Sequence, residues 1–545
     1  MVGWRILGVS SCNVSSTYHR KTMHDIRLNP LDAAWIVTET RATPNHVGGL
    51  VQFKLPDDAP KDFMRKMMAE FRSHRKFVAP WNQCLKPSFR MNPVRIWVED
   101  KNIDLEYHVR HAALPWPGGE RELGELVGRL QSTPLDLSRP PWECTIIEGL
   151  EGNRFAWFIK MHHSLIDGIS GVKLLQRSMS ADRTHSLDLP PFWASGKEPR
   201  AAARAHHEAL LPTVTHAIAG ALQELRIQAT TVPQLAVAFG KMVKRAMEPG
   251  NGMAIPFDAP RSILNGRVRE KRRFATQQFS LERMKALAAA ADCTLNDIVL
   301  AICGGALRRF LDERNSLPFK PMTAGIPVSV RPKDDDGNGN AITFIVSTLG
   351  TNIADVRERL AAIRQSVKQA KEQVQSLPRQ AMMQYTVLLM TPTILTLLTG
   401  IGGRTRPMFN ITISNVPGPD TPLFFRGAEM VAAYPASIVT HGQALNITCQ
   451  SYAGYMNFGF TGCHSSLPSM QRLAVYTADA LADMERAFMP GGVAHTLKPT
   501  VKAVKAVKAV KVTKEIKAAK VTKPKVALAP ARTPVPRAPR KKVAA

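Results

Sequence analysis

Apolar residues recur along the first part of the chain with two different periods, which predicts a mixture of strands and helices. Alternating or near-continuous apolar runs predict strands, and apolar residues three or four positions apart predict amphipathic helices. The predicted strands cover 46–55, 142–150 and 154–161, and the predicted helices cover 63–74, 122–136 and 168–179. The second and third strands flank the turn Glu151-Gly152-Asn153, so we expect them to pair as a hairpin.

The same mixture returns in the second part of the chain. Residues 281–313 predict two helices, with Thr294 as the N-cap of the second. Strands are expected in the segment that ends at Arg331, at 341–350 and at 409–419. Residues 445–462 predict a hairpin that turns at Ala453-Gly454. This pattern indicates an α/β (α+β) protein.

Changes in composition divide the chain. We expect a disordered N-terminal extension at 1–22, because the apolar run there is too short for the core of a signal peptide. An N-terminal domain follows at 23–183, then a helical connector and loop at 184–272, rich in Ala, His, Arg and Pro, and a C-terminal domain at 273–489. Residues 490–545 form a Lys/Ala/Val/Pro-rich tail that we expect to be disordered.

The most apolar stretch covers 383–403 and is interrupted by Pro392. A transmembrane helix needs about 20 dominantly apolar residues, and this stretch is marginal in length. Three interpretations remain open: a buried or groove-lining helix, an interfacial helix on a lipid surface, and a membrane span.

The net charge of +28 is concentrated in the tail, which carries 12 Lys and 3 Arg against one acid, Glu515, from Lys498 onward. Eight of these lysines recur every third residue between Lys502 and Lys523. On an α-helix this spacing distributes charge around the whole circumference, so no apolar face remains. The tail therefore predicts either polyanion binding, to nucleic acid or anionic lipid, or simple solubilisation.

The seven cysteines include no C-x-x-C pair, which disfavours a zinc ribbon or a disulfide framework and favours reduced thiols in a cytoplasmic protein.

The segment "MHHSLIDGIS" (161–170) carries the densest chemistry, with adjacent histidines followed by Asp167-Gly168. Adjacent histidines on an extended chain point to opposite sides and rarely hold one metal ion. They could instead be two satisfied histidines in a packed core. A second pair, His206-His207, has no Asp-Gly after it, and we expect it to be an exposed patch of the connector. The third interpretation is catalytic: a histidine at a strand-to-helix turn acts as general base, Asp167 orients the loop, and Gly168 allows a sharp turn or close backbone approach.

The other motifs that would indicate a known enzyme class are missing. Gly168-Ile169-Ser170-Gly171 is one residue short of the nucleophile elbow G-x-S-x-G, and neither GxGxxG nor a Walker loop occurs. A base without a protein nucleophile implies that a substrate hydroxyl attacks an activated acyl group directly.

"HHSLIDG" resembles the HHxxxDG motif of the CoA-dependent acyltransferases, which include chloramphenicol acetyltransferase and peptide-synthetase condensation domains. From about Asn29 to Met489 the chain resembles one branch, the bacterial wax ester synthase/acyl-CoA:diacylglycerol acyltransferases. The resemblance rests on "NPLDAAW", "TPNHVGGL", "RPPWE", "LNDIVLAICGGALRRFL", "IPVSVR", "ISNVPGP" and "GQALNITCQSYAGYMNFG". Two features depart from the family: Pro141 replaces the Leu of its Pro-Leu-Trp motif, and the basic tail is additional.

The resemblance implies two chloramphenicol-acetyltransferase-like domains with the active site at their interface. His163 is then the general base, and His162 supports the loop. Arg331 becomes the candidate ion-pair partner of Asp167.

The same resemblance implies further supporting residues. Asn296 and Asp297 would fix the cleft or donate hydrogen bonds, with helix capping as the alternative. Pro140 and Trp142 occupy the family's Pro and Trp positions; Trp142 would line the acyl channel or pack in the core.

The activity implied is transfer of a fatty acyl group from acyl-CoA, as co-substrate, to diacylglycerol or a long-chain alcohol, without a metal or other cofactor. The protein would be cytoplasmic and peripherally bound to an inner-membrane or lipid-droplet surface. Two alternatives stay open: an acyltransferase of this fold that uses a carrier protein, and a non-catalytic lipid-inclusion protein with a nucleic-acid-binding tail.

Overall fold

The computed structural model describes residues 26–27, 30–86, 96–166, 168–195, 254–329, 342–375 and 379–490. The predictions for Asp167, Arg331, the extension 1–22, most of the connector and nearly all of the tail therefore lie outside the described residues.

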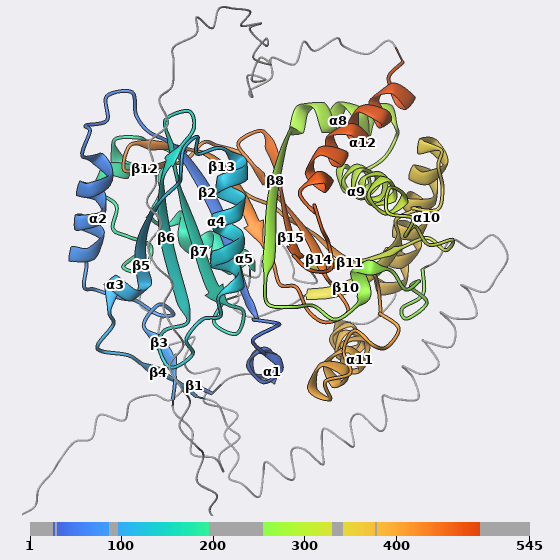
Figure 1. The fold of residues 1–545 in the computed structure, drawn as a ribbon, viewed down its shortest axis with the longest axis horizontal. Coiled ribbons are helices and arrows are strands. Elements are labelled where there is room, and N and C mark those ends of the chain that lie inside the picture. Colours follow the sequence, from blue (N-terminus) through green and yellow to red (C-terminus); the bar gives the residue numbers. More distant parts are fainter. Residues whose placement is uncertain are drawn as a thin grey trace, which may run out of the picture. The chain divides into compact units, whose positions relative to one another are not determined.

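Two six-stranded mixed sheets dominate the fold (Figure 1). The first has the order β12-β13-β2-β7-β6-β5, and its strands cover Phe424–Phe425, Ala428–Ala436, His46–Lys54, Arg154–His162, Trp142–Leu150 and Val109–Ala113. The second has the order β10-β9-β11-β14-β15-β8, covering Ile342–Thr348, Thr323–Ser329, Ile411–Val416, Leu445–Tyr452, Tyr455–Cys463 and Arg272–Ser280. The predicted hairpins β6–β7 and β14–β15 are both confirmed.

Helices cover the two sheets. In the first half they are α1 (Pro30–Thr38), α2 (Phe63–Ser73), α3 (Leu105–His108), α4 (Glu120–Ser132) and α5 (Gly168–Gln176). In the second half they are α8 (Leu281–Ala290), α9 (Leu295–Asp312), α10 (Val356–Gln375), α11 (Arg379–Leu398) and α12 (Arg472–Phe488). A small sheet joins β1 (Ile26–Arg27), β4 (Ile96–Glu99) and β3 (Gln83–Leu85). The mixed α/β prediction is confirmed.

The second half of the chain contributes strands to the first sheet. Strands β12 and β13 come from the predicted C-terminal domain, yet β13 pairs antiparallel with β2 of the first sheet. Both faces of β13 are used: Met430 and Ala433 join the core on one side of the sheet, and Ala432 and Tyr434 join the core on the other. The predicted boundary at residue 273 therefore does not separate two independent sheets, since alternation within a strand does not specify which sheet it enters.

Helix α4 packs between the first sheet and β8, and its glycines set the spacing (Figure 1). A Cβ added at Gly124 would lie 2.9 Å from the carbonyl oxygen of Phe274, and one at Gly128 would lie 3.0 Å from that of Arg272. The helix thus meets the backbone of β8 directly, which holds the two halves together.

The apolar stretch predicted at 383–403 forms most of α11, which contains Pro392. Within the described ranges, no single helix has both the length and the apolar character needed to cross a membrane; α8 and α9 pass that test only as a pair bent by 96°.

We expect Gly124→Val to lower the free energy of unfolding by about 1–3 kcal/mol, because the added side chain forces α4 away from β8. Urea denaturation monitored by tryptophan fluorescence measures this change. Gly49→Val is the matched control, since a Cβ at Gly49 meets no atom within 4 Å. Equal destabilisation of both variants would show that the α4–β8 approach is not the cause.

Candidate active site

The histidine pair lies where β7 ends and the chain turns toward α5, which is the strand–turn–helix context that the sequence predicts. Strand β7 is buried along almost its whole length, and His162 pairs in register with His46 of β2. Because side chains alternate along the strand, Met161 faces the aromatic core of the first half, and His162 points to the opposite face.

His162 is fully buried and fixed on both sides of its ring. The backbone N–H of Ser164 donates to its Nδ1 (3.2 Å), and the Ser164 hydroxyl lies 2.6 Å from the same atom. An Nδ1 that accepts leaves the proton on Nε2, which lies 3.3 Å from a carboxylate oxygen of Glu39. These contacts restrain the end of β7.

His163 is only half-buried, and its contacts include one through the backbone and one through the ring. Its backbone N–H donates to the carbonyl of Asn45 (2.9 Å). Its imidazole stacks on the indole of Trp35, with ring centroids 4.5 Å apart and an interplanar angle of 23°. A general base needs a defined ring orientation together with access to substrate; the stacking on Trp35 defines the ring plane of His163, and the residue is partly exposed.

Asn45 connects these groups and is itself buried. Its side-chain amide donates to the carbonyl of Trp35 (2.6 Å) and to the Thr38 hydroxyl (3.0 Å), which ties down the last turn of α1. Its backbone N–H donates to Glu39 (3.1 Å). One asparagine thus holds the backbone of His163, the helix that carries the stacking indole, and the carboxylate that faces His162.

Sequence reasoning missed Trp35, Glu39 and Asn45 as site residues. Trp35 and Asn45 lie in segments that carry the family resemblance, Glu39 lies between those segments, and no local spacing links residues 35–45 to residue 163. Their roles depend on the pairing of β2 with β7, which brings His46 beside His162.

A buried arginine from the second half reaches the turn between α1 and β2. Arg272 donates to the carbonyl of Ala42 (2.7 Å), three residues before Asn45, and its backbone N–H donates to the Ser132 hydroxyl (2.8 Å). Its remaining contacts are to the carbonyls of Arg269, Glu270 and Val439. Burial lowers the pKa of Arg272 to about 10, so the guanidinium stays charged at neutral pH and links the halves beside the histidines.

The Pro-Pro-Trp segment (140–142) is hydrogen-bonded to the end of β7. The carbonyl of Pro141 accepts the backbone N–H of His162 (2.9 Å), and the carbonyl of buried Pro140 accepts that of Trp142 (2.8 Å). Trp142 is fully buried: its indole N–H donates to the carbonyl of Trp81 (2.8 Å), and its ring stacks on His108 at 4.5 Å. The structure therefore places Trp142 in the core, which is the alternative that the sequence left open.

Gly168 begins α5 in an exposed position, and a Cβ there would meet no atom within 4 Å. Close packing therefore does not require a glycine at this position.

The Asn296-Asp297 pair lies elsewhere, at the start of α9 in the second half. Asp297 forms a capping box: its carboxylate accepts from the backbone N–H (3.0 Å) and hydroxyl (2.7 Å) of Thr294, and the Thr294 hydroxyl accepts from the Asp297 N–H (3.2 Å). The predicted N-cap is confirmed, and helix capping is the role that the contacts of Asp297 support.

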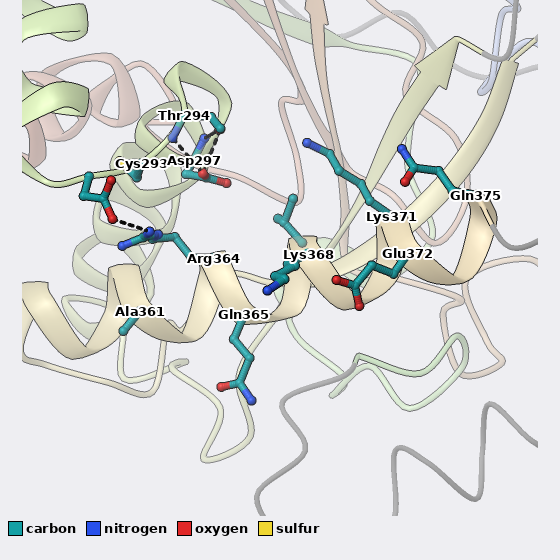
Figure 2. A pocket seen from close by; sticks show the side chains of 12 residues that line it. Cys293, Thr294, Asp297, Ala361, Arg364, Gln365, Lys368, Lys371, Glu372 and Gln375 are labelled. Atoms are coloured by element: carbon teal, nitrogen blue, oxygen red, sulfur yellow. Dashed lines mark hydrogen bonds and ion pairs between the residues drawn. The ribbon is translucent and has the colours of Figure 1, made fainter.

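A groove of about 860 Å³ opens beside this cap, between α9 and α10 (Figure 2). Arg364, Lys368 and Lys371 line it from α10, and Arg364 pairs with Asp292 at 3.2 Å. None of its lining residues comes from the first half, so this groove is separate from the histidine pair. Within the described ranges, no three His, Cys, Asp or Glu side chains are grouped so that they could hold a metal ion.

Buried polar side chains flank His162 on the same face of the sheet. Burial, with a smaller contribution from Lys160, holds the pKa of His46 well below its usual value, and its Nε2 lies 3.0 Å from the carbonyl of Gln131. Lys160 pairs with Glu143 (3.2 Å) and donates to the carbonyls of Leu130 and Thr133 near the end of α4. Burial lowers the pKa of Lys160 as well, although Glu143 opposes this change.

Two family models match the chain. The model described as the wax ester synthase/diacylglycerol acyltransferase catalytic domain matches residues 28–299, and the WS/DGAT C-terminal domain matches residues 338–485.

Curated relatives and a solved structure cover most of the chain. A putative diacylglycerol O-acyltransferase of Mycobacterium tuberculosis is 43% identical over 492 residues, which cover 85% of this chain and 97% of the relative. The O-acyltransferase WSD of Acinetobacter baylyi is 39% identical over 455 residues, covering 83% and 96%. The solved wax ester synthase/diacylglycerol acyltransferase of Marinobacter aquaeolei is 34% identical, with a TM-score of 0.68, and the match covers 85% of this chain and 100% of that one.

We expect stability to fall as the pH drops below about 6.5, because the unfolded chain then binds a proton at His46 that the folded chain excludes. This group contributes at most about 1.4 kcal/mol per pH unit to the free energy of unfolding. Denaturation curves between about pH 7.5 and 5.5 measure the slope, and His46→Gln should reduce it. The exposed His185→Gln should leave the slope as it is; an unchanged slope in His46→Gln would contradict the assignment.

Proposed function

Since the chain belongs to the wax ester synthase/diacylglycerol acyltransferase family, we propose that it transfers a fatty acyl group from acyl-CoA to the hydroxyl of a diacylglycerol or a long-chain alcohol. The observation that carries this proposal is the geometry of His163: a half-buried residue just after a buried strand, oriented by Trp35 and Asn45. The relatives named as diacylglycerol O-acyltransferases and as WSD support the class of reaction.

In the proposed mechanism His163 removes the proton from the acceptor hydroxyl while the hydroxyl oxygen attacks the thioester carbonyl. The tetrahedral intermediate collapses with cleavage of the carbon–sulfur bond, and the proton passes from His163 to the departing CoA thiolate. The ester and free CoA are the products, so no acyl-enzyme forms and no cofactor takes part. A correctly placed general base contributes roughly 10²- to 10⁴-fold to such a reaction.

The surrounding residues act on His163 rather than on substrate. Asn45 fixes its backbone and, through Trp35, the plane of its ring. Glu39 and Ser164 contact His162 and restrain the end of β7. Arg272 links the turn between α1 and β2 to the second half, through the carbonyl of Ala42.

The proposed site of action is a lipid surface in the cytoplasm, an inner membrane or a lipid droplet, where diacylglycerols and long-chain alcohols concentrate. The basic tail beyond Lys498 would add attraction to nucleic acid or anionic lipid, in proportion to its charge. Nothing in the mechanism depends on the tail.

We expect His163→Ala to lower acceptor-dependent release of CoA from palmitoyl-CoA by about 10²-fold or more, because the mutant lacks the base. A thiol assay with dioleoylglycerol or hexadecanol measures the rate and identifies the acceptor. His185→Ala, which removes an exposed histidine, should match the unmodified protein. Equal rates in His163→Ala and the unmodified protein would make His163 structural.

We expect Asn45→Ala to lower kcat by roughly 10- to 100-fold with little change in KM, because misorientation of the base affects the transition state more than binding. Thr38→Val is the graded control, since it removes only one of the two acceptors of the Asn45 side chain. It should lose clearly less activity. A rise in KM without a fall in kcat would contradict a positioning role for Asn45.

A further inference from the structure

We propose that α1 and α11 form a docking surface for an anionic phospholipid layer, and that the lipid acceptor approaches His163 from this side. The proposal rests on the proposed function for the identity of the acceptor. The surface has exposed apolar side chains, is carried by a helix with a buried side, and has exposed arginines beside it. Helix α1 also lies next to His163.

Large apolar side chains are exposed on α1 and around the end of α11. Val37 is 59% exposed, Leu395 53%, Leu398 49% and Ile401 43%. The two helices pack against each other and lie together at the lower edge of the molecule in Figure 1. The remaining large apolar side chains exposed in the described residues are at other sites: Trp116, Leu187, Phe319, Tyr455 and Val475.

The exposed face belongs to an anchored helix. Leu389 of α11 is buried against Val346, Met408 and Phe409, and α11 packs on β10. The end of the helix closes on itself, because the backbone N–H of Gly402 donates to the carbonyl of Thr396 (2.8 Å). The outward apolar residues are therefore presented by a fixed element.

Exposed arginines lie beside the apolar residues at the end of α11. Arg267 donates to the carbonyl of Gly400 (2.6 Å) and Arg261 to that of Arg404 (2.6 Å), so both guanidinium groups lie at the end of α11. Arg404 and Arg406 follow the helix and are also exposed. Among the described residues, no carboxylate lies within 4 Å of any of these four arginines.

Apolar side chains beside arginines that contact no carboxylate of the described residues fit one partner, a lipid layer with negatively charged headgroups. A second copy of this chain fits poorly, because a two-fold interface would bring the same arginines face to face. The phosphates of a phospholipid surface accept guanidinium hydrogen bonds, and the acyl region accepts the leucine side chains.

Helix α1 connects this surface to the chemistry. It presents Val37 to the outside, and two residues earlier in the same helix Trp35 stacks on His163. Residues two apart on an α-helix point to roughly opposite sides, so α1 has the proposed lipid contact on one side and the general base on the other.

The first experiment measures co-sedimentation of the full-length protein with vesicles of phosphatidylcholine and phosphatidylglycerol in 1 M salt. The Debye length is then about 3 Å, which suppresses attraction by the tail and isolates apolar insertion. Leu395→Asp/Leu398→Asp should lower partitioning by about tenfold or more. Val475→Asp removes an equally exposed apolar residue from α12 and should bind like the unmodified protein.

The second experiment tests the arginines at low salt. Arg404→Gln/Arg406→Gln should weaken binding to the mixed vesicles more than Lys101→Gln/Lys285→Gln, which removes the same charge from exposed sites elsewhere and leaves the tail intact. Equal weakening in both double variants would overturn the assignment of these arginines to the lipid contact.

Acyl-transfer assays with a lipid acceptor and a water-soluble acceptor distinguish loss of lipid docking from loss of catalysis. Leu395→Asp/Leu398→Asp should lose transfer to dioleoylglycerol in vesicles but keep transfer to a short water-soluble alcohol. Unchanged vesicle binding in this variant would overturn the docking surface, as would a dimer of the unmodified protein that the variant dissociates. Absence of transfer to any acceptor in the unmodified protein would instead overturn the proposed function, whatever the vesicles show.

Discussion

The bonding of Asn45 is the constraint on which the rest of the site depends. A buried amide must satisfy its donors within the protein, and here they go to the carbonyl of Trp35 and the hydroxyl of Thr38. The same residue accepts the N–H of His163. The position of Asn45 thus determines how His163, Trp35 and helix α1 are oriented. The pairing of β2 with β7 sets the position of Asn45.

Two buried cations, Lys160 and Arg272, connect the elements around the histidines. Lys160 contacts a carboxylate and carbonyl groups, whereas the guanidinium of Arg272 contacts carbonyl groups. Lys160 is balanced by Glu143 and also bonds carbonyls near the C-terminus of α4, where the helix dipole is negative. Arg272 bonds carbonyl groups and the Ser132 hydroxyl, and its acceptors come from both halves of the molecule. Because a buried charge that loses its partners is very costly, these two residues resist any separation of α4, β7 and β8.

Much of the fold was predictable from the sequence, because local patterns determine it. The near-continuous apolar run of β7, the turn at Ala453-Gly454 and the cap at Thr294 each carry their signal within a few residues. The location of His162 and His163 after a buried strand was predictable for the same reason. Glu39 and Trp35 were not, since their partners lie more than a hundred residues away. The burial of Trp142 also depends on distant rings, those of Trp81, His108, Phe192 and Trp193.

The pairing of β13 with β2 has a consequence for biosynthesis. When a ribosome has released β2 and β7, the first sheet still has an open edge, because β13 ends only at Ala436. At about 5–20 residues per second, the intervening chain takes roughly a quarter of a minute to a minute to appear. During that interval the nascent chain exposes the unpaired backbone of β2, a template for aggregation. The edge of β2 therefore stays open until residues 428–436 emerge, in the last quarter of the chain.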